Sequence, residues 1–170
     1  FTSVMFDGST KSLKNNIKIS AQISELAHKY NVSVEGEVGE VGYFKKNNSK
    51  GTDIHEAKEY SSKSKVDAMA ISVGNTHLQT SKIAKINYQK ILDIQKITRL
   101  PLVLHGSSGI SYIMRNKIAR STKVAKFNIG TELRMIACKS LRKSYNNNIK
   151  NFDKISIIKP SIKALKKETI

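Results

Sequence analysis

Residues 100–109 read Leu-Pro-Leu-Val-Leu-His-Gly-Ser-Ser-Gly, a short apolar run followed by a polar turn rich in glycine and serine. A continuous aliphatic run of this length, bounded by turn residues, is typical of a buried strand in a parallel sheet. Similar runs occupy four other places in the chain, at residues 1–6, 32–38, 68–73 and 124–129. The sequence therefore predicts five parallel strands that are buried on both faces.

The stretches between these runs are longer and have the composition of helices. We expect helices at residues 11–30, 54–65, 83–98, 110–121 and 132–144, and a last one at 155–167 that is interrupted or started near Pro160. Between Leu133 and Leu141 the apolar residues recur at helical spacing, which makes one apolar face. Alternating strands and helices predict right-handed βαβ units within one domain over residues 1–170.

Each predicted strand ends in polar residues that can take part in chemistry, at 7–9, 35–37, 74–77, 105–109 and 128–131. In a β/α barrel the C-terminal ends of the strands form one rim, where catalytic groups from different strands gather. A complete barrel has eight strands and typically about 250 residues. We therefore expect an α/β fold, a (β/α)8 TIM barrel of which only about the last five βα units are present, with the other three before Phe1.

The charge balance is strongly basic, with 30 Lys and Arg against 13 Asp and Glu and a net charge of +17. Such a charge is compatible with nucleic-acid binding. The lysines, however, are scattered along the whole chain, arginine is rare, and no zinc finger or aromatic RNA-binding motif occurs. We read this charge as compositional drift and keep nucleic-acid binding as an alternative.

Cysteine content and hydropathy bear on the compartment. A single cysteine, Cys138, excludes an internal disulfide, which fits a reducing cytoplasm. No apolar run reaches the length of about 18 residues that indicates a membrane span. We therefore expect a cytoplasmic protein without a membrane partner.

Two histidines follow predicted strands, which indicates a metal site. His77 and His105 stand where imidazoles from neighbouring strands can converge, and Asp7 and Glu37 add carboxylate oxygens on the same rim. A mixed set of imidazole and carboxylate ligands suits Zn²⁺ or a similar divalent ion.

Two glycine-containing turns precede predicted helices, at residues 106–109 and 128–131. Backbone N–H groups at helix starts bind phosphate, and the loops after the last two barrel strands are a recurrent phosphate site. The substrate indicated by these turns is a small phosphorylated molecule.

Six motifs in chain order resemble those of the class II, metal-dependent ketose-bisphosphate aldolases, which act on fructose or tagatose bisphosphate. These motifs are SVMFDGS at 3–9, VSVEGEVG at 32–39, TDIHEAK at 52–58, GNTH at 74–77, PLVLHG at 101–106 and VAKFNIGTEL at 124–133. The resemblance implies reversible cleavage of a ketose 1,6-bisphosphate into dihydroxyacetone phosphate and glyceraldehyde 3-phosphate, in glycolysis or related carbohydrate metabolism. It also implies a homodimer or homotetramer for the full-length protein.

The resemblance assigns roles to particular residues. It implies that His77 and His105 are two of the three ligands of a catalytic Zn²⁺, and that Asp7 and Glu37 form a second metal position. The residues implied to hold the dihydroxyacetone-phosphate half of the substrate are Leu78, Gly106, Ser107, Ser108, Asn128, Ile129, Gly130 and Thr131.

Parts of the family pattern are absent from this chain. The family's acid/base Asp and third zinc-ligand His belong to a Leu-His-x-Asp-His motif, which we expect upstream of residue 1, so we predict that this polypeptide alone is inactive. Leu78 replaces the Gly that usually follows the first zinc His. Gly130 stands where fructose-type enzymes often carry Asp and tagatose-type enzymes a small residue, so the choice of sugar stays open. A degenerate, catalytically silent relative is the main alternative.

Overall fold

A computed structural model describes residues 1–43, 49–147, 149–150 and 152–169. The chain divides into two compact units, residues 1–128 and residues 129–170. The first contains all five strands and the second contains two helices. Among the described residues, no helix has both the length and the apolar character needed to cross a membrane.

The five strands of the first unit form one sheet in the order β1-β2-β3-β4-β5, and every neighbouring pair is parallel. Their bounds are β1 Ser3–Phe6, β2 Ser33–Val38, β3 Ala68–Ile71, β4 Leu102–Leu104 and β5 Val124–Phe127. This confirms the predicted parallel strands, each shorter than its apolar run. Sequential order with parallel pairing is the arrangement of consecutive βα units in a barrel.

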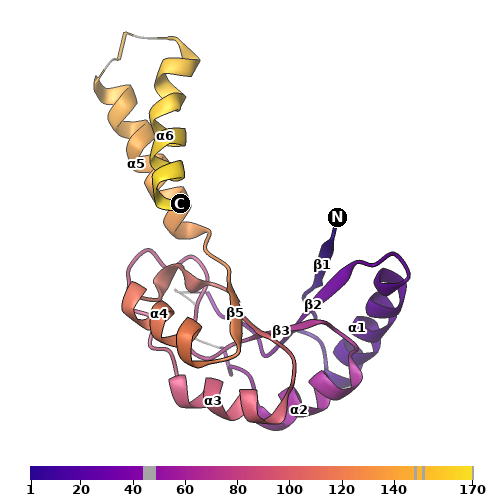
Figure 1. Cartoon of the computed structure of the whole chain (residues 1–170). Helices are drawn as coiled ribbons and strands as arrows, with labels where there is room; N and C mark the ends of the chain where they lie inside the picture. The colour runs from indigo at the N-terminus through magenta and orange to yellow at the C-terminus, as the bar shows by residue number, and fades with distance from the viewer. Residues whose placement is uncertain (44–48, 148, 151, 170) are drawn as a thin grey trace. The chain divides into compact units, whose positions relative to one another are not determined.

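Four helices alternate with these strands and lie along one side of the curved sheet (Figure 1). They are α1 Leu13–His28, α2 Ile54–Lys63, α3 Tyr88–Ile97 and α4 Tyr112–Ser121. Each begins after a residue whose side chain accepts a backbone N–H of the first turn, namely Ser12, Asp53, Asn87 and Ser111. These residue types are strongly preferred at helix N-caps.

The helix predicted at residues 83–98 is wrong at its start, because α3 begins only at Tyr88. Asn87 provides the reason: its side chain accepts the N–H of Lys90, and its own N–H donates to the carbonyl of Val73. The second bond fixes the start of the helix against the chain that leaves β3.

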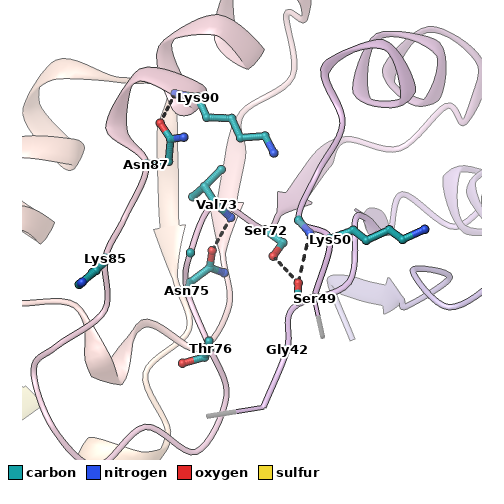
Figure 2. Close-up of a pocket in the computed structure, with 12 residues that line it drawn as sticks. Gly42, Ser49, Lys50, Ser72, Val73, Asn75, Thr76, Lys85, Asn87 and Lys90 are labelled. Atoms are coloured by element: carbon teal, nitrogen blue, oxygen red, sulfur yellow. Dashed lines mark hydrogen bonds between the residues drawn. The ribbon is translucent and has the colours of Figure 1, made fainter. Parts of the chain in front are cut away.

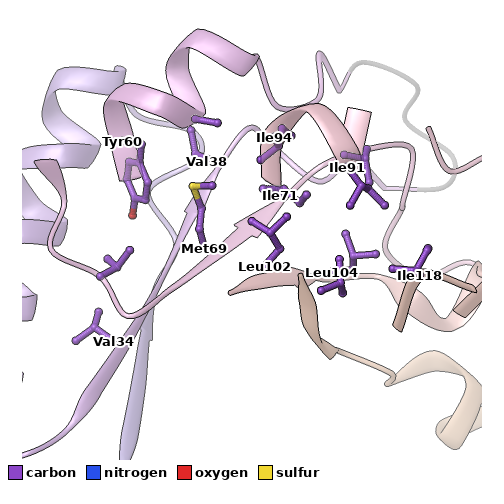
Figure 3. Close-up of a cluster of buried hydrophobic side chains, with 14 of the residues drawn as sticks. Val34, Val38, Tyr60, Met69, Ile71, Ile91, Ile94, Leu102, Leu104 and Ile118 are labelled. Atoms are coloured by element: carbon purple, nitrogen blue, oxygen red, sulfur yellow. The ribbon is translucent and has the colours of Figure 1, made fainter. Parts of the chain in front are cut away.

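The hydrophobic core lies between the sheet and these helices (Figure 3). Alternate strand residues point into it, and the fully buried members are Val34, Val38, Met69, Ile71, Leu102 and Leu104. Tyr60 of α2, Ile91 and Ile94 of α3 and Ile118 of α4 meet them from the helix side. Burying each of these side chains contributes roughly 1.5–3 kcal/mol.

The prediction that every strand is buried on both faces is wrong for β1 and β5, the two edge strands of the described sheet, since Ala125 and Lys126 of β5 are exposed. Val4 and Met5 are 37% and 44% exposed, whereas the three central strands are almost entirely buried. In the described sheet β1 has only one neighbour, and an edge strand leaves part of its surface uncovered.

The second unit consists of α5 Thr131–Asn147 and α6 Lys154–Thr169, which pack against each other. The predicted interruption of the last helix at Pro160 is wrong, because α6 runs through that residue. Proline has no N–H for the carbonyl of Ser156 four residues earlier, and the Ser144 hydroxyl of α5 lies 3.5 Å from that carbonyl as a donor. Ser161 also bonds across the pair, to the Ala137 carbonyl at 3.1 Å.

Candidate active site

Two buried carboxylates, Glu35 and Glu37, project from β2 on the face opposite the hydrophobic core. Alternate residues of a strand point to opposite faces, so Val34 and Val38 enter the core while the two glutamates face the other way. Glu35 is 4% exposed and Glu37 is 2% exposed. Because a buried carboxylate is costly without partners, the surrounding groups decide whether these residues stay charged.

His105 follows β4 and binds both glutamates. Its Nε2 atom lies 2.8 Å from Oε1 of Glu35, and its Nδ1 atom lies 2.9 Å from Oε2 of Glu37. Burial on its own would lower the pKa of His105, but the hydrogen bonds and charges of the two carboxylates outweigh it and raise the pKa to about 9. The imidazole is therefore a cation held between two anions at neutral pH.

Lys126 of β5 extends this charged cluster. Its Nζ atom lies 2.7 Å from Oε2 of Glu35, so the two oxygens of that carboxylate bind two different cations. Burial would raise the pKa of Glu35, whereas the bonds to His105 and Lys126 lower it below its ordinary value. Glu37, His105, Glu35 and Lys126 form a chain of alternating charges, which we call the Glu–His–Glu–Lys cluster.

Sequence reasoning assigned roles to Glu37 and His105 but missed Glu35 and Lys126 as site residues. The alternation of Glu35 and Glu37 at positions i and i+2 of a predicted strand was a usable signal for Glu35, since such residues share one face. Lys126 could not be identified as a site residue in this way, because the chain contains many lysines and the sequence does not show which of them contacts Glu35.

His77 lies beside this cluster. Its ring centroid is 6.4 Å from that of His105 and 5.4 Å from that of Tyr43, and its backbone N–H donates to the Gly42 carbonyl at 2.8 Å. Burial, reinforced by the positive charge of His105, lowers the pKa of His77, against the opposing effects of Glu37 and Asp7. The pKa values of the two neighbouring imidazoles are thus shifted in opposite directions.

Asp7 is exposed at the end of β1, where its Oδ1 atom accepts the N–H of Ser9 at 3.0 Å and the Ser9 hydroxyl at 2.6 Å. It acts on His77 only through its charge. The structure therefore brings His77, His105 and Glu37 together, and leaves Asp7 at the margin of the group.

The predicted zinc ligands His77 and His105 are of a residue type that binds zinc, and the resemblance places only these two of the three ligands in this chain. Within the part of the chain that the structure describes, no three His, Cys, Asp or Glu side chains are arranged to hold a metal ion. A metal-bound histidine usually donates its second ring N–H to a carboxylate, as His105 can do to one glutamate. To bind zinc, His105 must release the other glutamate and lose its proton, since the ligand is the neutral ring.

Asn75 fixes the position of the two strand ends that carry the histidines. It is 1% exposed, its Oδ1 atom accepts the Val73 N–H at 2.7 Å, and its Nδ2 atom donates to the His105 carbonyl at 2.9 Å. These bonds tie the loop after β3 to the end of β4. We assign Asn75 a positioning role that the sequence did not indicate.

In the turn predicted to bind phosphate after β4, the polar groups of Ser107 are bonded to neighbouring backbone carbonyls. The turn forms a short 3₁₀ helix, η1 Ser107–Gly109. The Ser107 hydroxyl donates to the Leu104 carbonyl at 2.7 Å, and the Ser107 N–H donates to the Asn128 carbonyl at 3.1 Å. Gly106 has a φ of +58°, and a Cβ there would lie 2.5 Å from the Thr76 carbonyl oxygen. Glycine at 106 therefore allows the turn to pass against the loop that carries His77.

The remaining predicted substrate residues are divided between the two units. Asn128 ends the first unit, where its N–H donates to the Leu104 carbonyl at 2.9 Å. Ile129, Gly130 and Thr131 belong to the second unit, in which the Thr131 hydroxyl accepts a bond from Arg134 at 2.9 Å.

Leu78 has an unusual backbone conformation for its residue type. Its φ is +57°, in the left-handed region, and its side chain is 57% exposed. A leucine in this region is strained, because its Cβ crowds the backbone. The position at which the resemblance led us to expect glycine is thus one where the backbone favours glycine.

Comparisons with known proteins indicate the family to which the chain belongs. The family model for class II fructose-bisphosphate aldolase matches residues 1–170. The 6-phospho-5-dehydro-2-deoxy-D-gluconate aldolase of Shouchella clausii is 38% identical over 78% of this chain and 46% of its own length. The fructose-bisphosphate aldolase of Mycoplasma genitalium is 38% identical over 87% of this chain and 52% of its own length. The chain therefore spans about half the length of these relatives.

Solved structures show the same fold. The YdjI aldolase of Escherichia coli K12 superposes with a TM-score of 0.78 at 27% identity, covering 99% of this chain and 57% of that protein. The fructose-bisphosphate aldolase of Campylobacter jejuni gives a TM-score of 0.80 at 20% identity, over 99% of this chain and 58% of that protein. With a family model matching its whole length and relatives that are 38% identical over 78% and 87% of the chain, this chain belongs to the class II fructose-bisphosphate aldolase family.

Proposed function

We propose that the protein of which this chain forms part cleaves a phosphorylated ketose by retro-aldol chemistry at the rim that carries His77 and His105. The observation that carries this proposal is the Glu–His–Glu–Lys cluster beside His77, at the C-terminal ends of parallel strands, where β/α barrels place their active sites. Residues 1–170 would then be one part of a single barrel domain.

We further propose that His77 and His105 contribute two ligands to a catalytic Zn²⁺, and that Asp7 and Glu37 contribute to a second metal position. A divalent ion at such a site acts as a Lewis acid toward a substrate carbonyl. Within this chain, Lys126 holds Glu35, Glu35 orients the His105 ring, and Asn75 holds the His105 backbone. The acid/base Asp and the third ligand would come from residues outside this chain, so the chain alone would be inactive.

Two substrate classes are candidates, because relatives named for each of them are equally similar to this chain. Relatives named for fructose bisphosphate and for 6-phospho-5-dehydro-2-deoxy-D-gluconate each share 38% identity with this chain. We favour a ketose 1,6-bisphosphate, either fructose or tagatose, because the resemblance rests on motifs of those enzymes. The residues from Gly106 to Ser108 and from Asn128 to Thr131, with Leu78, would bind the dihydroxyacetone-phosphate half.

A substrate panel tests the proposal. The full-length protein of which this chain forms part should cleave one of the three phosphorylated substrates, and a chelator should stop the reaction. His105→Ala should abolish cleavage, whereas His55→Ala, an exposed histidine on α2, should leave it unchanged. A folded protein that binds zinc but cleaves none of the three would instead support the silent relative.

The location and assembly of the protein are also proposals. We propose a cytoplasmic homodimer or homotetramer, as the family resemblance implies. Salt-sensitive binding of DNA or RNA would instead favour the basic nucleic-acid-binding alternative.

A further inference from the structure

A separate pocket lies between the loop that follows β2 and the start of α3 (Figure 2). It has a volume of about 370 Å³. Among the residues that line it are Ser49, Lys50, Gly51, Ser72, Asn87 and Lys90. Its lining also includes Asn75, so it borders the candidate active site, but neither His77, His105 nor the turn at residues 106–108 lines it.

The charged residues among the described lining of this pocket are all lysines. Lys50, Lys85 and Lys90 line it, and no Asp or Glu does. Other lysines of the unit have carboxylate partners, such as Lys63, whose Nζ atom lies 2.8 Å from Glu59. For the three pocket lysines, no ion pair is formed with any described residue. Like charges gathered at one cavity repel one another, and a bound anion would turn that repulsion into attraction.

Asp53 interacts with Lys90 through its charge, and one of its carboxylate oxygens already accepts two hydrogen bonds. Its Oδ1 atom accepts the N–H groups of His55 and Glu56 at 2.8 Å and 3.1 Å, as the N-cap of α2. These backbone bonds are the largest cause of its lowered pKa, and the charge of Lys90 is the smallest.

Hydrogen-bond donors stand at the same pocket. The Ser72 hydroxyl is 1% exposed, and its Oγ atom lies 3.4 Å from that of Ser49, a long contact. Ser49 donates its own proton to the Glu40 carbonyl, which leaves Ser72 as the donor in the pair. An anion that accepted the Ser72 proton would replace a weak bond with a charge-assisted one.

The backbone shape keeps space open beside the ammonium group of Lys90. Gly51 has a φ of +69°, and a Cβ at that position would lie 3.4 Å from Nζ of Lys90 and 3.1 Å from the Ser72 carbonyl. In Figure 2 the Lys90 side chain runs from the start of α3 toward Ser72. The α3 N-terminus, with its partial positive charge, faces the same place.

We propose that this pocket binds a phosphate group, free or as the monoester of a small molecule, with Lys90 as the principal cation and the Ser72 hydroxyl as a donor. Lys50 and Lys85 add to the positive field around it. The site is additional to the substrate-phosphate segments proposed above, and it stands whether or not the protein is an active aldolase.

Phosphate binding by the full chain tests this directly, without an activity assay. Titration of the isotope-labelled chain with inorganic phosphate, in the presence of a chelator, should shift the amide resonances of Gly51, Ser72 and Lys90. Lys90→Met should weaken binding about ten-fold or more, the effect of losing one charge-assisted bond. Lys90→Arg, which keeps the charge, should retain most of the affinity.

Matched controls separate the pocket from general charge effects. Lys58→Met removes an exposed lysine of α2 that does not line the pocket and should leave the affinity unchanged. Glycerol 3-phosphate should produce the same shifts as inorganic phosphate. Shifts confined to residues 106–109, or equal weakening by Lys58→Met and Lys90→Met, would overturn the proposal.

Discussion

The Nζ atom of Lys126 on β5 lies 2.7 Å from Oε2 of Glu35 on β2, although β3 and β4 stand between the two strands. Neighbouring strands are about 4.8 Å apart, so three strand spacings separate the two residues along the sheet. The contact forms because the sheet is curved and brings its inner faces toward each other (Figure 1). The contact between Lys126 and Glu35 therefore depends on the curvature of the sheet.

Removing the Lys126 ammonium group should change the unfolding free energy only slightly, but it should shift the pKa of Glu35. Lys126→Met should lower the unfolding free energy by less than about 1 kcal/mol, because the lysine side chain is 52% exposed and the pair is screened by water. The pKa of Glu35 should rise, since one of the groups that lower it is lost. Urea denaturation and an NMR titration of Glu35 measure the two effects, with Lys58→Met as the control.

Stability should fall as the solution becomes alkaline. The pKa of His105 is raised from its ordinary value of 6.5 to about 9 in the folded chain, so the folded state binds this proton more tightly than the unfolded state. The resulting stabilisation is complete below about pH 6.5 and disappears as the pH rises through about 9. The expected loss is on the order of 3 kcal/mol.

Urea unfolding at several pH values between about 6 and 10, in the presence of a chelator, measures this loss. His105→Gln removes the titrating group and should flatten the profile in this range. A wild-type profile as flat as that of His105→Gln would show that His105 is not held as a cation between the two glutamates.

Replacing Leu78 with glycine should stabilise the chain. The left-handed conformation costs leucine about 1–2 kcal/mol, and the side chain is mostly exposed, so little buried surface is lost. After the larger entropy of glycine in the unfolded state is subtracted, we expect a gain of roughly 0.5–1 kcal/mol. Leu26→Gly is the matched control: that leucine is similarly exposed but lies within α1, and its replacement should destabilise by about 1 kcal/mol.

Gly106→Ala should destabilise the chain strongly, whereas Gly130→Ala should have little effect on stability. An alanine Cβ at 106 meets the Thr76 carbonyl at 2.5 Å and requires a positive φ, so we expect a loss of about 2 kcal/mol or more. At Gly130 the nearest atom is the end of the Arg134 side chain at 3.1 Å, which can move aside. Thermal unfolding of the two variants should rank them in this order, and equal losses would contradict the geometry.

The order of the elements could be predicted because it depends on local patterns. Apolar runs such as residues 68–73 and 100–104 require burial, and the intervening segments carry helical periodicity and N-cap residues such as Asp53 and Ser111. The alternation of strands and helices follows from these local patterns, and right-handed βαβ connections then favour parallel neighbours in chain order. The later start of α3 was missed because the Asn87 cap depends on a bond to Val73 in another segment.

Polar residues at the strand ends could also be located from the sequence, since the ends of parallel strands share one rim. Their pairing could not. Glu35, Glu37, His105 and Lys126 are separated by up to 91 residues, and which carboxylate meets which cation depends on strand register and sheet curvature. Residue types and their spacing along the chain thus determined the strand order, the rim and the family, because these depend on burial and periodicity. The charge state of His105, the role of Lys126 and the lysine-lined pocket were decided only by tertiary structure, because electrostatic energies depend on distances that folding alone creates.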